Sequence, residues 1–125
     1  DSLLQERAWR LALGETATGG RIAQRLAAEG CGSFAGSIVI PPRGVPASGS
    51  ARALAERARE LFPAECALGI WTDPAGTRTD GCLLTPEGDR EWVIPYAGTD
   101  SRGQTRISVT ALEYVRRHLT GVAFT

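Results

Sequence analysis

Residues 11–23 read L-A-L-G-E-T-A-T-G-G-R-I-A and predict how the chain begins to fold. Apolar positions lead into Glu15, two threonines and two glycines follow, and helical spacing begins after them. A buried strand that passes into a helix across a glycine turn is typical of α/β proteins, which bind ligands at the carboxyl ends of their strands. We therefore expect Thr16 and Thr18 to lie at a binding or catalytic edge of a sheet.

The rest of the chain alternates between strand and helix patterns. The predicted elements are a short helix at 2–8, strand 9–14, helix 21–29, strand 36–40, helix 51–62, strands 66–71, 81–85 and 91–96, and a last helix that starts with the capping pair Ser101 and Gln104. Glu87-Gly88-Asp89 forms a hairpin turn between the last two strands. This order predicts an α/β protein: a three-layer α/β/α domain with a mixed five-stranded sheet, one strand antiparallel.

Helical spacing also predicts which residues face the core. The expected inward-facing residues of the three longer helices are Ile22, Ala23, Leu26 and Ala27, then Leu54, Ala58, Leu61 and Phe62, then Ile107, Ala111, Val115 and Leu119. With helices on both faces, the loops 15–20, 41–50 and 72–80 would meet at the carboxyl edge of the sheet.

The composition fits one globular domain, which we place over residues 1–125. Hydrophobic residues make up 42% of the chain, and 14 acidic residues balance 14 basic ones, all of them arginine. This balance gives no reason to expect nucleic acid or a membrane as a partner, and no stretch approaches the ~20 apolar residues that span a bilayer. We expect a cytoplasmic protein, and because the chain opens on Asp1 it can be the tail of a longer one.

The cysteines and the single histidine offer few ligands for a metal. Cys31, Cys66 and Cys82 form no C-x-x-C pair, and we expect reduced, mostly buried thiols. We expect no metal and no cofactor. The remaining partner is a small nucleotide or phosphate ligand, and association into a homo-oligomer stays open.

The turn after the first strand is a candidate anion site. Gly19 and Gly20 let the backbone approach a ligand, and the helix that follows offers free N–H groups and a positive dipole end. Thr16 and Thr18 could add hydroxyl donors. The alternative is that Thr18 only caps the helix and the glycines only make the turn.

Two further segments could contribute to the same site. The loop W-T-D-P-A-G-T at 71–77 follows a buried strand, and such loops carry function as well as ordinary turns. Arg102 and Arg106 open the last helix and could bind a phosphate bidentately. The alternative is that both arginines are solvated residues of the helix surface.

Four strings, in order along the chain, resemble the C-terminal domain of the competence/damage-inducible CinA family. They are A-L-G-E-T-A-T-G-G (12–20), F-A-G-S-I-V (34–39), C-A-L-G-I-W-T-D-P-A-G-T-R-T-D-G (66–81) and Y-A-G-T-D-S-R (96–102). The resemblance implies a three-layer α/β/α fold with a mixed five-stranded sheet, and the activity of a nicotinamide-mononucleotide deamidase.

The resemblance also implies site residues. Those that match the family strings E-S-C-T-G-G and G-I-A-G-P-x-G-G-T are Glu15, Thr18, Gly19 and Gly20, then Gly69, Ile70, Pro74, Gly76 and Thr77, with Asp73 intruding before the proline. The third string, F-x-G-D-R, is echoed loosely by Gly98, Asp100 and Arg102. This implies a ligand site made by Glu15, Thr18, Gly19, Gly20, Pro74, Gly76, Thr77, Arg102 and Arg106.

The catalytic residues of the family are altered. Thr16 stands where the family has its nucleophilic serine, and Ala17 where it has cysteine. The family tyrosine and lysine that activate the serine, spaced Y-x-x-x-x-K, are missing from the equivalent segment 40–45. A threonine hydroxyl needs a base within hydrogen-bond reach to attack an amide, and base assistance contributes about 10²–10⁴ in rate.

Three hypotheses follow. The first is a CinA-type domain with impaired or lost catalysis and a residual nucleotide or phosphate pocket. The second is an active deamidase with Thr16 as nucleophile and Glu15, Asp73 or His118 as base. The third is a structural or interaction domain without a ligand.

Overall fold

The computed structural model describes residues 2–16, 21–28, 32–39, 50–72, 78–95 and 101–120. Its elements are α1 (Ser2–Glu6), β1 (Leu11–Glu15), α2 (Arg21–Ala28), β2 (Phe34–Val39), α3 (Ala51–Leu61), β3 (Cys66–Thr72), β4 (Thr79–Leu84), β5 (Arg90–Ile94) and α4 (Ser101–Thr120). Every predicted element is present, with ends displaced by a few residues.

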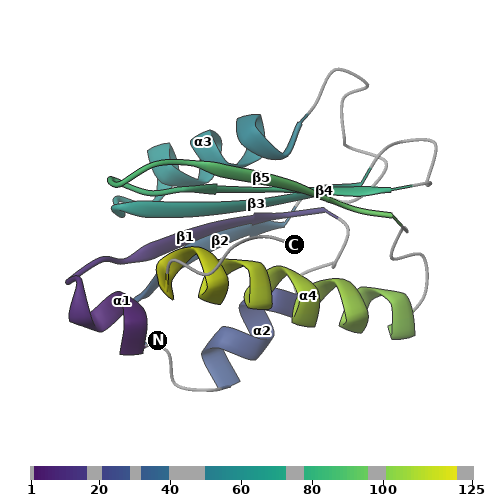
Figure 1. The fold of residues 1–125 in the computed structure, drawn as a ribbon, viewed down its shortest axis with the longest axis horizontal. Coiled ribbons are helices and arrows are strands. Elements are labelled where there is room, and N and C mark those ends of the chain that lie inside the picture. Colours follow the sequence, from purple (N-terminus) through teal and green to yellow (C-terminus); the bar gives the residue numbers. More distant parts are fainter. Residues whose placement is uncertain are drawn as a thin grey trace.

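The strands form one sheet in the order β2-β1-β3-β4-β5. β1 pairs in parallel with β2 and β3, whereas β4 is antiparallel to both β3 and β5. One strand of five therefore runs against the others, as predicted. In Figure 1, α3 covers one face of the sheet while α1, α2 and α4 lie on the other, which confirms the three-layer arrangement.

The two sides of the sheet are packed differently. Large aliphatic side chains such as Leu68, Ile70 and Ile107 fill the side that faces α2 and α4. The α3 side is closer, because alanines and a glycine line it. A Cβ at Gly69 would collide with the carbonyl oxygen of Ala51, so the backbone of α3 lies directly on β3. This contact fixes the start of α3 against the middle of the sheet.

The predicted inner faces of the helices are largely confirmed. All four α4 positions are buried, as are the leucine and isoleucine of α2. Leu61 and Ala27 were predicted inside and are exposed, Leu61 by 45%. At the end of α3, the extended residue Phe62 takes the inward position and packs over Gly36 of β2, and Leu61 in the last turn of the helix points outward.

Two cysteines lie inside the sheet. Cys66 and Cys82 are buried free thiols, as predicted, while Cys31 lies outside the described residues. Burial disfavours the thiolate and raises the pKa of Cys66 to about 12 and that of Cys82 to about 11. Neither thiol is suited to nucleophilic chemistry near neutral pH.

None of the helices in the described residues is both long and apolar enough to cross a membrane.

Candidate functional site

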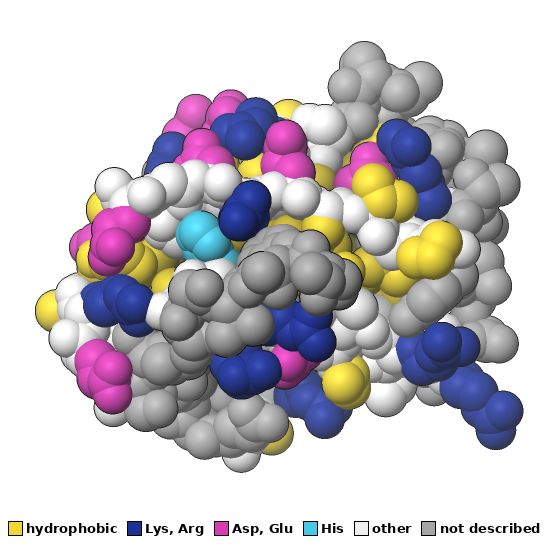
Figure 2. Space-filling view, in the orientation of Figure 1, with side chains coloured by type: hydrophobic (Ala, Val, Ile, Leu, Met, Phe, Trp, Pro, Cys, Tyr) yellow, Lys and Arg dark blue, Asp and Glu magenta, His cyan; other side chains and the backbone are white. Residues whose placement is uncertain are grey.

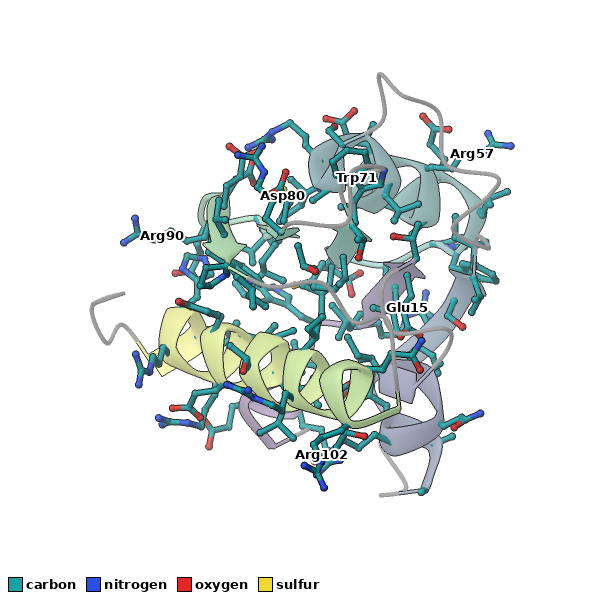
Figure 3. All side chains as sticks on the ribbon, turned by 90° about the vertical axis from the view of Figure 1, so that its right-hand side faces the viewer. Glu15, Arg57, Trp71, Asp80, Arg90 and Arg102 are labelled. Carbon is teal, nitrogen blue, oxygen red and sulfur yellow. The ribbon has the colours of Figure 1, made fainter. Side chains whose placement is uncertain are left out.

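The carboxyl edge of the sheet brings together the ends of β1 and β3 and the start of β4. Figure 3 looks onto this edge and shows Glu15 where β1 ends. Glu15, Thr16 and Thr79 are almost fully buried and Thr72 partly so. Four polar side chains thus lie where a sheet of this type binds ligands, and their hydrogen bonds decide what each can do.

The Glu15 carboxylate caps α2. Its Oε1 accepts a hydrogen bond from the backbone N–H of Ile22 at 2.9 Å, and its Oε2 accepts one from Ala23 at 3.1 Å. These are first-turn N–H groups that have no partner within the helix. A negative charge at this end is also favoured by the helix dipole. Glu15 therefore caps the first turn of α2 through two of its N–H groups.

This cap changes the expected anion site. A phosphate at the start of α2 would need the N–H groups of Ile22 and Ala23, and Glu15 already occupies both. Its buried charge would also repel an anion placed beside it. Any phosphate at this edge therefore needs donors other than these two groups.

The Thr16 hydroxyl links β1 to β3. Its Oγ1 accepts a hydrogen bond from the backbone N–H of Thr72 at 3.0 Å and donates one to the carbonyl oxygen of Ile70 at 3.3 Å. The backbone N–H of Thr16 donates to the same carbonyl at 2.9 Å. The side chain is 1% exposed. The hydroxyl extends the β1–β3 pairing past the last residue of β1.

These bonds bear directly on catalysis. A nucleophilic hydroxyl must pass its proton to a base as it attacks, but the acceptor within reach of the Thr16 hydroxyl is the Ile70 carbonyl oxygen at 3.3 Å, which is not a base. Within the described ranges, no carboxylate or imidazole hydrogen-bonds Oγ1. The hydroxyl therefore acts as a structural tie, by which we mean a side chain that joins two strands through hydrogen bonds.

A second tie joins the two strands that flank residues 73–77. The hydroxyls of Thr72 and Thr79 lie 3.3 Å apart and share a hydrogen bond. Thr79 is fully buried and was not singled out from the sequence. One signal in the sequence could have identified it. Thr79 follows a Pro/Gly loop and an arginine, and a second threonine, Thr72, stands at the other end of that loop.

Several predicted site residues lie outside the described residues: Thr18, Gly19, Gly20, Asp73, Pro74, Gly76, Thr77, Gly98 and Asp100, with the segment 40–45. Their roles stay predictions.

The two predicted arginines are exposed on α4. In Figure 3, Arg102 extends from the side of α4 away from the sheet, far from the Glu15 label. Contact of Arg102 or Arg106 with a ligand stays a prediction.

His118 was considered as a base for Thr16, and the structure places it elsewhere. It lines a small hollow with Trp9, Thr85 and Glu87 at the opposite edge of the sheet, because it belongs to the last turn of α4. His118 therefore lies away from Thr16 in this structure, and the second hypothesis stays a prediction.

A hollow of about 300 Å³ lies on the α3 side of β4 and β5. Its charged walls are already paired, since Arg78 lies 3.3 Å from Asp80 and Arg52 lies 3.2 Å from Glu91. None of the predicted site residues within the described ranges lines it. The described residues contain no group of three or more His, Cys, Asp or Glu side chains that could hold a metal ion.

Neither protein-family models nor curated protein sequences give a match to this chain. Solved structures do. A competence-damaged protein (CinA) superfamily protein from Klebsiella pneumoniae aligns with a TM-score of 0.80 over 96% of this chain and 92% of its own, at 16% identity.

Two further matches have the same character. A competence or damage-inducible protein from Enterobacter asburiae gives a TM-score of 0.77 at 15% identity, over 94% of this chain and 92% of its own. A competence/damage inducible protein from Agrobacterium tumefaciens gives a TM-score of 0.74 at 18% identity, over 95% of this chain and 90% of its own. The chain has the fold of these CinA-superfamily proteins over nearly its whole length.

Proposed function

We propose that this chain is a CinA-type domain that has lost the deamidase chemistry and keeps a site for a small nucleotide or phosphate-bearing ligand. The shared fold supports the family, and the sequence strings around the carboxyl edge support the location of the site. The loss of chemistry rests on one observation: within the described residues, the buried Thr16 hydroxyl forms its two hydrogen bonds with the backbone of β3.

The active alternative needs a base that the described residues do not supply. Both oxygens of Glu15 hold the first turn of α2, and His118 lies at the other edge of the sheet. The chain has no lysine at all. Asp73 is the remaining candidate, and it lies outside the described residues.

The ligand is expected to be held by the loops rather than by α2. Since Glu15 occupies two first-turn N–H groups, the backbone of Gly19 and Gly20 and the hydroxyls of Thr18 and Thr77 are the expected donors to a phosphate. A ligand with a cationic ring beside its phosphate, such as nicotinamide mononucleotide, would suit an edge that holds a buried carboxylate.

The test is a titration of the protein with nicotinamide mononucleotide and with inorganic phosphate, followed by melting temperature. Saturable stabilisation is expected for the nucleotide in the millimolar range or below. It should weaken in Gly19→Val, whose side chain blocks a close backbone approach. If neither ligand shifts the melting temperature, the pocket is absent and the interaction-domain hypothesis replaces this one.

A serine variant tests the chemistry separately. Thr16→Ser keeps the hydroxyl, so the ties to Thr72 and Ile70 should persist and no ammonia should be released from nicotinamide mononucleotide. A large gain of deamidase activity in Thr16→Ser would show that a base is present and that the proposal of lost catalysis is wrong.

A further inference from the structure

The outward face of α4 carries a regular stripe of charged residues. Arg102, Arg106, Val109, Glu113 and Arg116 follow one another at alternating intervals of four and three. Residues at this spacing lie above one another on a helix, and the stripe extends over about 21 Å at 1.5 Å per residue. We call it the α4 outer stripe.

The layer that holds this stripe is basic although the whole chain is neutral. Six arginines and a single acidic residue, Glu113, fall within α2 and α4. In Figure 2, blue side chains predominate over α4 in the lower right of the molecule, whereas most magenta ones lie along the upper edge. The neutral net charge conceals this separation of basic and acidic residues. The net charge therefore does not argue against an anionic partner for this face.

Glu113, the single acidic residue within α2 and α4, is paired at one end of the stripe. Glu113 accepts hydrogen bonds from Arg116 at 2.6 and 2.9 Å and from Arg117 at 3.2 Å. The first of these contacts chiefly lowers the pKa of Glu113, to about 2. At the other end of the stripe, Arg102 forms no hydrogen bond or ion pair with any described residue.

An apolar contact point lies in the middle of the stripe. Val109 is 47% exposed and borders a hollow of about 260 Å³ that Tyr114 and Arg117 also line. A second hollow of about 210 Å³ lies between α2 and α4, against Arg25 and Ser108. Thr110 and the Arg-paired carboxylate of Glu113 complete the lining of the first hollow. The stripe therefore offers arginines on both sides of a small, partly apolar depression.

We propose that the α4 outer stripe is a docking surface for an acidic protein segment that carries an aliphatic side chain. Arginine clusters recognise acidic motifs through charge-assisted hydrogen bonds, and the Val109 hollow would take the aliphatic side chain. This inference concerns a different face from the carboxyl edge and does not depend on the proposed nucleotide site.

Other occupants fit the surface less well. A polyphosphate backbone would make no use of the Val109 hollow, and a membrane surface requires a broad apolar helix face, whereas that of α4 is buried in the core. A second copy offers carboxylates from several separate elements, and its Asp89 and Glu91 are held by Arg52, so self-association is an outcome that the experiment must distinguish. Charge complementarity favours an acidic partner segment.

The experiment uses the full chain and a fluorescent glutamate peptide with one central leucine, followed by anisotropy at low and physiological salt. We expect saturable binding that weakens with salt. Arg102→Gln with Arg106→Gln should lower the affinity about ten-fold, since each exposed ion pair contributes modestly. The matched control is Arg57→Gln with Arg90→Gln, which removes one arginine from α3 and one from β5, both separate from Arg102 in Figure 3, and should leave binding unchanged.

A second variant tests the apolar contact. Val109→Ser should remove the preference for the leucine peptide over an all-glutamate peptide. The proposal is wrong if the wild-type protein does not bind the peptide, or if both arginine pairs reduce binding equally. It is also wrong if duplex DNA or anionic phosphatidylserine vesicles bind more tightly than the peptide. A wild-type dimer that Arg102→Gln with Arg106→Gln converts to a monomer would likewise contradict it, because the surface would then bind a second copy.

Discussion

Replacement of Thr16 by valine removes the hydroxyl and keeps the shape of the side chain. Because the Thr16 hydroxyl links β1 to β3, its loss should destabilise the fold. The N–H of Thr72 loses its acceptor at 3.0 Å. The Ile70 carbonyl keeps the bond from the Thr16 N–H at 2.9 Å, so only one group is left without a partner.

The expected magnitude follows from that count. One buried donor without an acceptor costs about 1–3 kcal/mol, and the lost 3.3 Å bond to Ile70 adds little. We therefore expect Thr16→Val to lower the free energy of unfolding by about 2 kcal/mol. Thr16→Ser keeps both bonds and loses one methyl group, which costs about 1 kcal/mol.

Urea denaturation followed by circular dichroism measures these differences. Thr110→Val is the matched control, because this half-buried threonine on α4 forms no hydrogen bond through its hydroxyl within the described residues, and the change should stay within about 0.5 kcal/mol. A Thr16→Val protein as stable as the wild type, or more stable, would refute the structural tie. Removal of a catalytic group often has that stabilising effect.

Three further predictions concern other parts of the fold. Glu15→Ala leaves two first-turn N–H groups of α2 without a partner and should cost about 2–3 kcal/mol; millimolar acetate should raise the melting temperature of this variant but not that of the wild type, and a lack of rescue would contradict the capping role. Gly69→Ala should destabilise by about 2 kcal/mol or more, since the new methyl group meets the backbone of α3; a neutral effect in urea denaturation would show that α3 is not fixed there. Because burial raises the pKa of Cys66 to about 12 and of Cys82 to about 11, neither should react with a maleimide in the native protein at pH 8, and the stability that their neutral forms contribute below about pH 8.5 should fall as the pH rises toward 11; rapid labelling of more than one thiol at pH 8 would contradict this burial.

Periodicity and turn residues were sufficient to predict the three layers, the order of elements along the chain and the single antiparallel strand, but not the order of the strands in the sheet. The apolar runs 66–71 and 81–85 predict buried strands, and the helical spacing of apolar residues predicts the inner face of α4. The structure buries these residues in the core. The outward position of Leu61 could not be predicted, because Leu61 and Phe62 compete for one inward direction and the glycine in β2 that accommodates Phe62 decides between them.

The candidate site was harder to predict for a physical reason. The sequence shows which residues lie near the carboxyl edge but not which groups they bond. The sequence predicts Glu15 as a ligand residue. In the structure its carboxylate accepts hydrogen bonds from backbone N–H groups of α2, and sequence patterns do not show where those groups lie. Thr16 resembles a nucleophile by its place in the string, yet the backbone of β3, more than fifty residues later, fixes its hydroxyl.

The charge on α4 was also concealed, because a net charge sums over both faces of the molecule. Only the fold places the arginines of α2 and α4 in one layer. Composition therefore gave a correct total and no information about this surface.

Ammonia release from nicotinamide mononucleotide, measured with enzyme and substrate at comparable concentrations over many hours, tests the central claim that Thr16 is a tie and not a nucleophile. The account predicts that the wild-type protein releases no more ammonia than Thr16→Ala, and at least ~10²-fold less than an intact CinA deamidase. Sustained release by the wild type that disappears in Thr16→Ala, with both proteins folded, would contradict it.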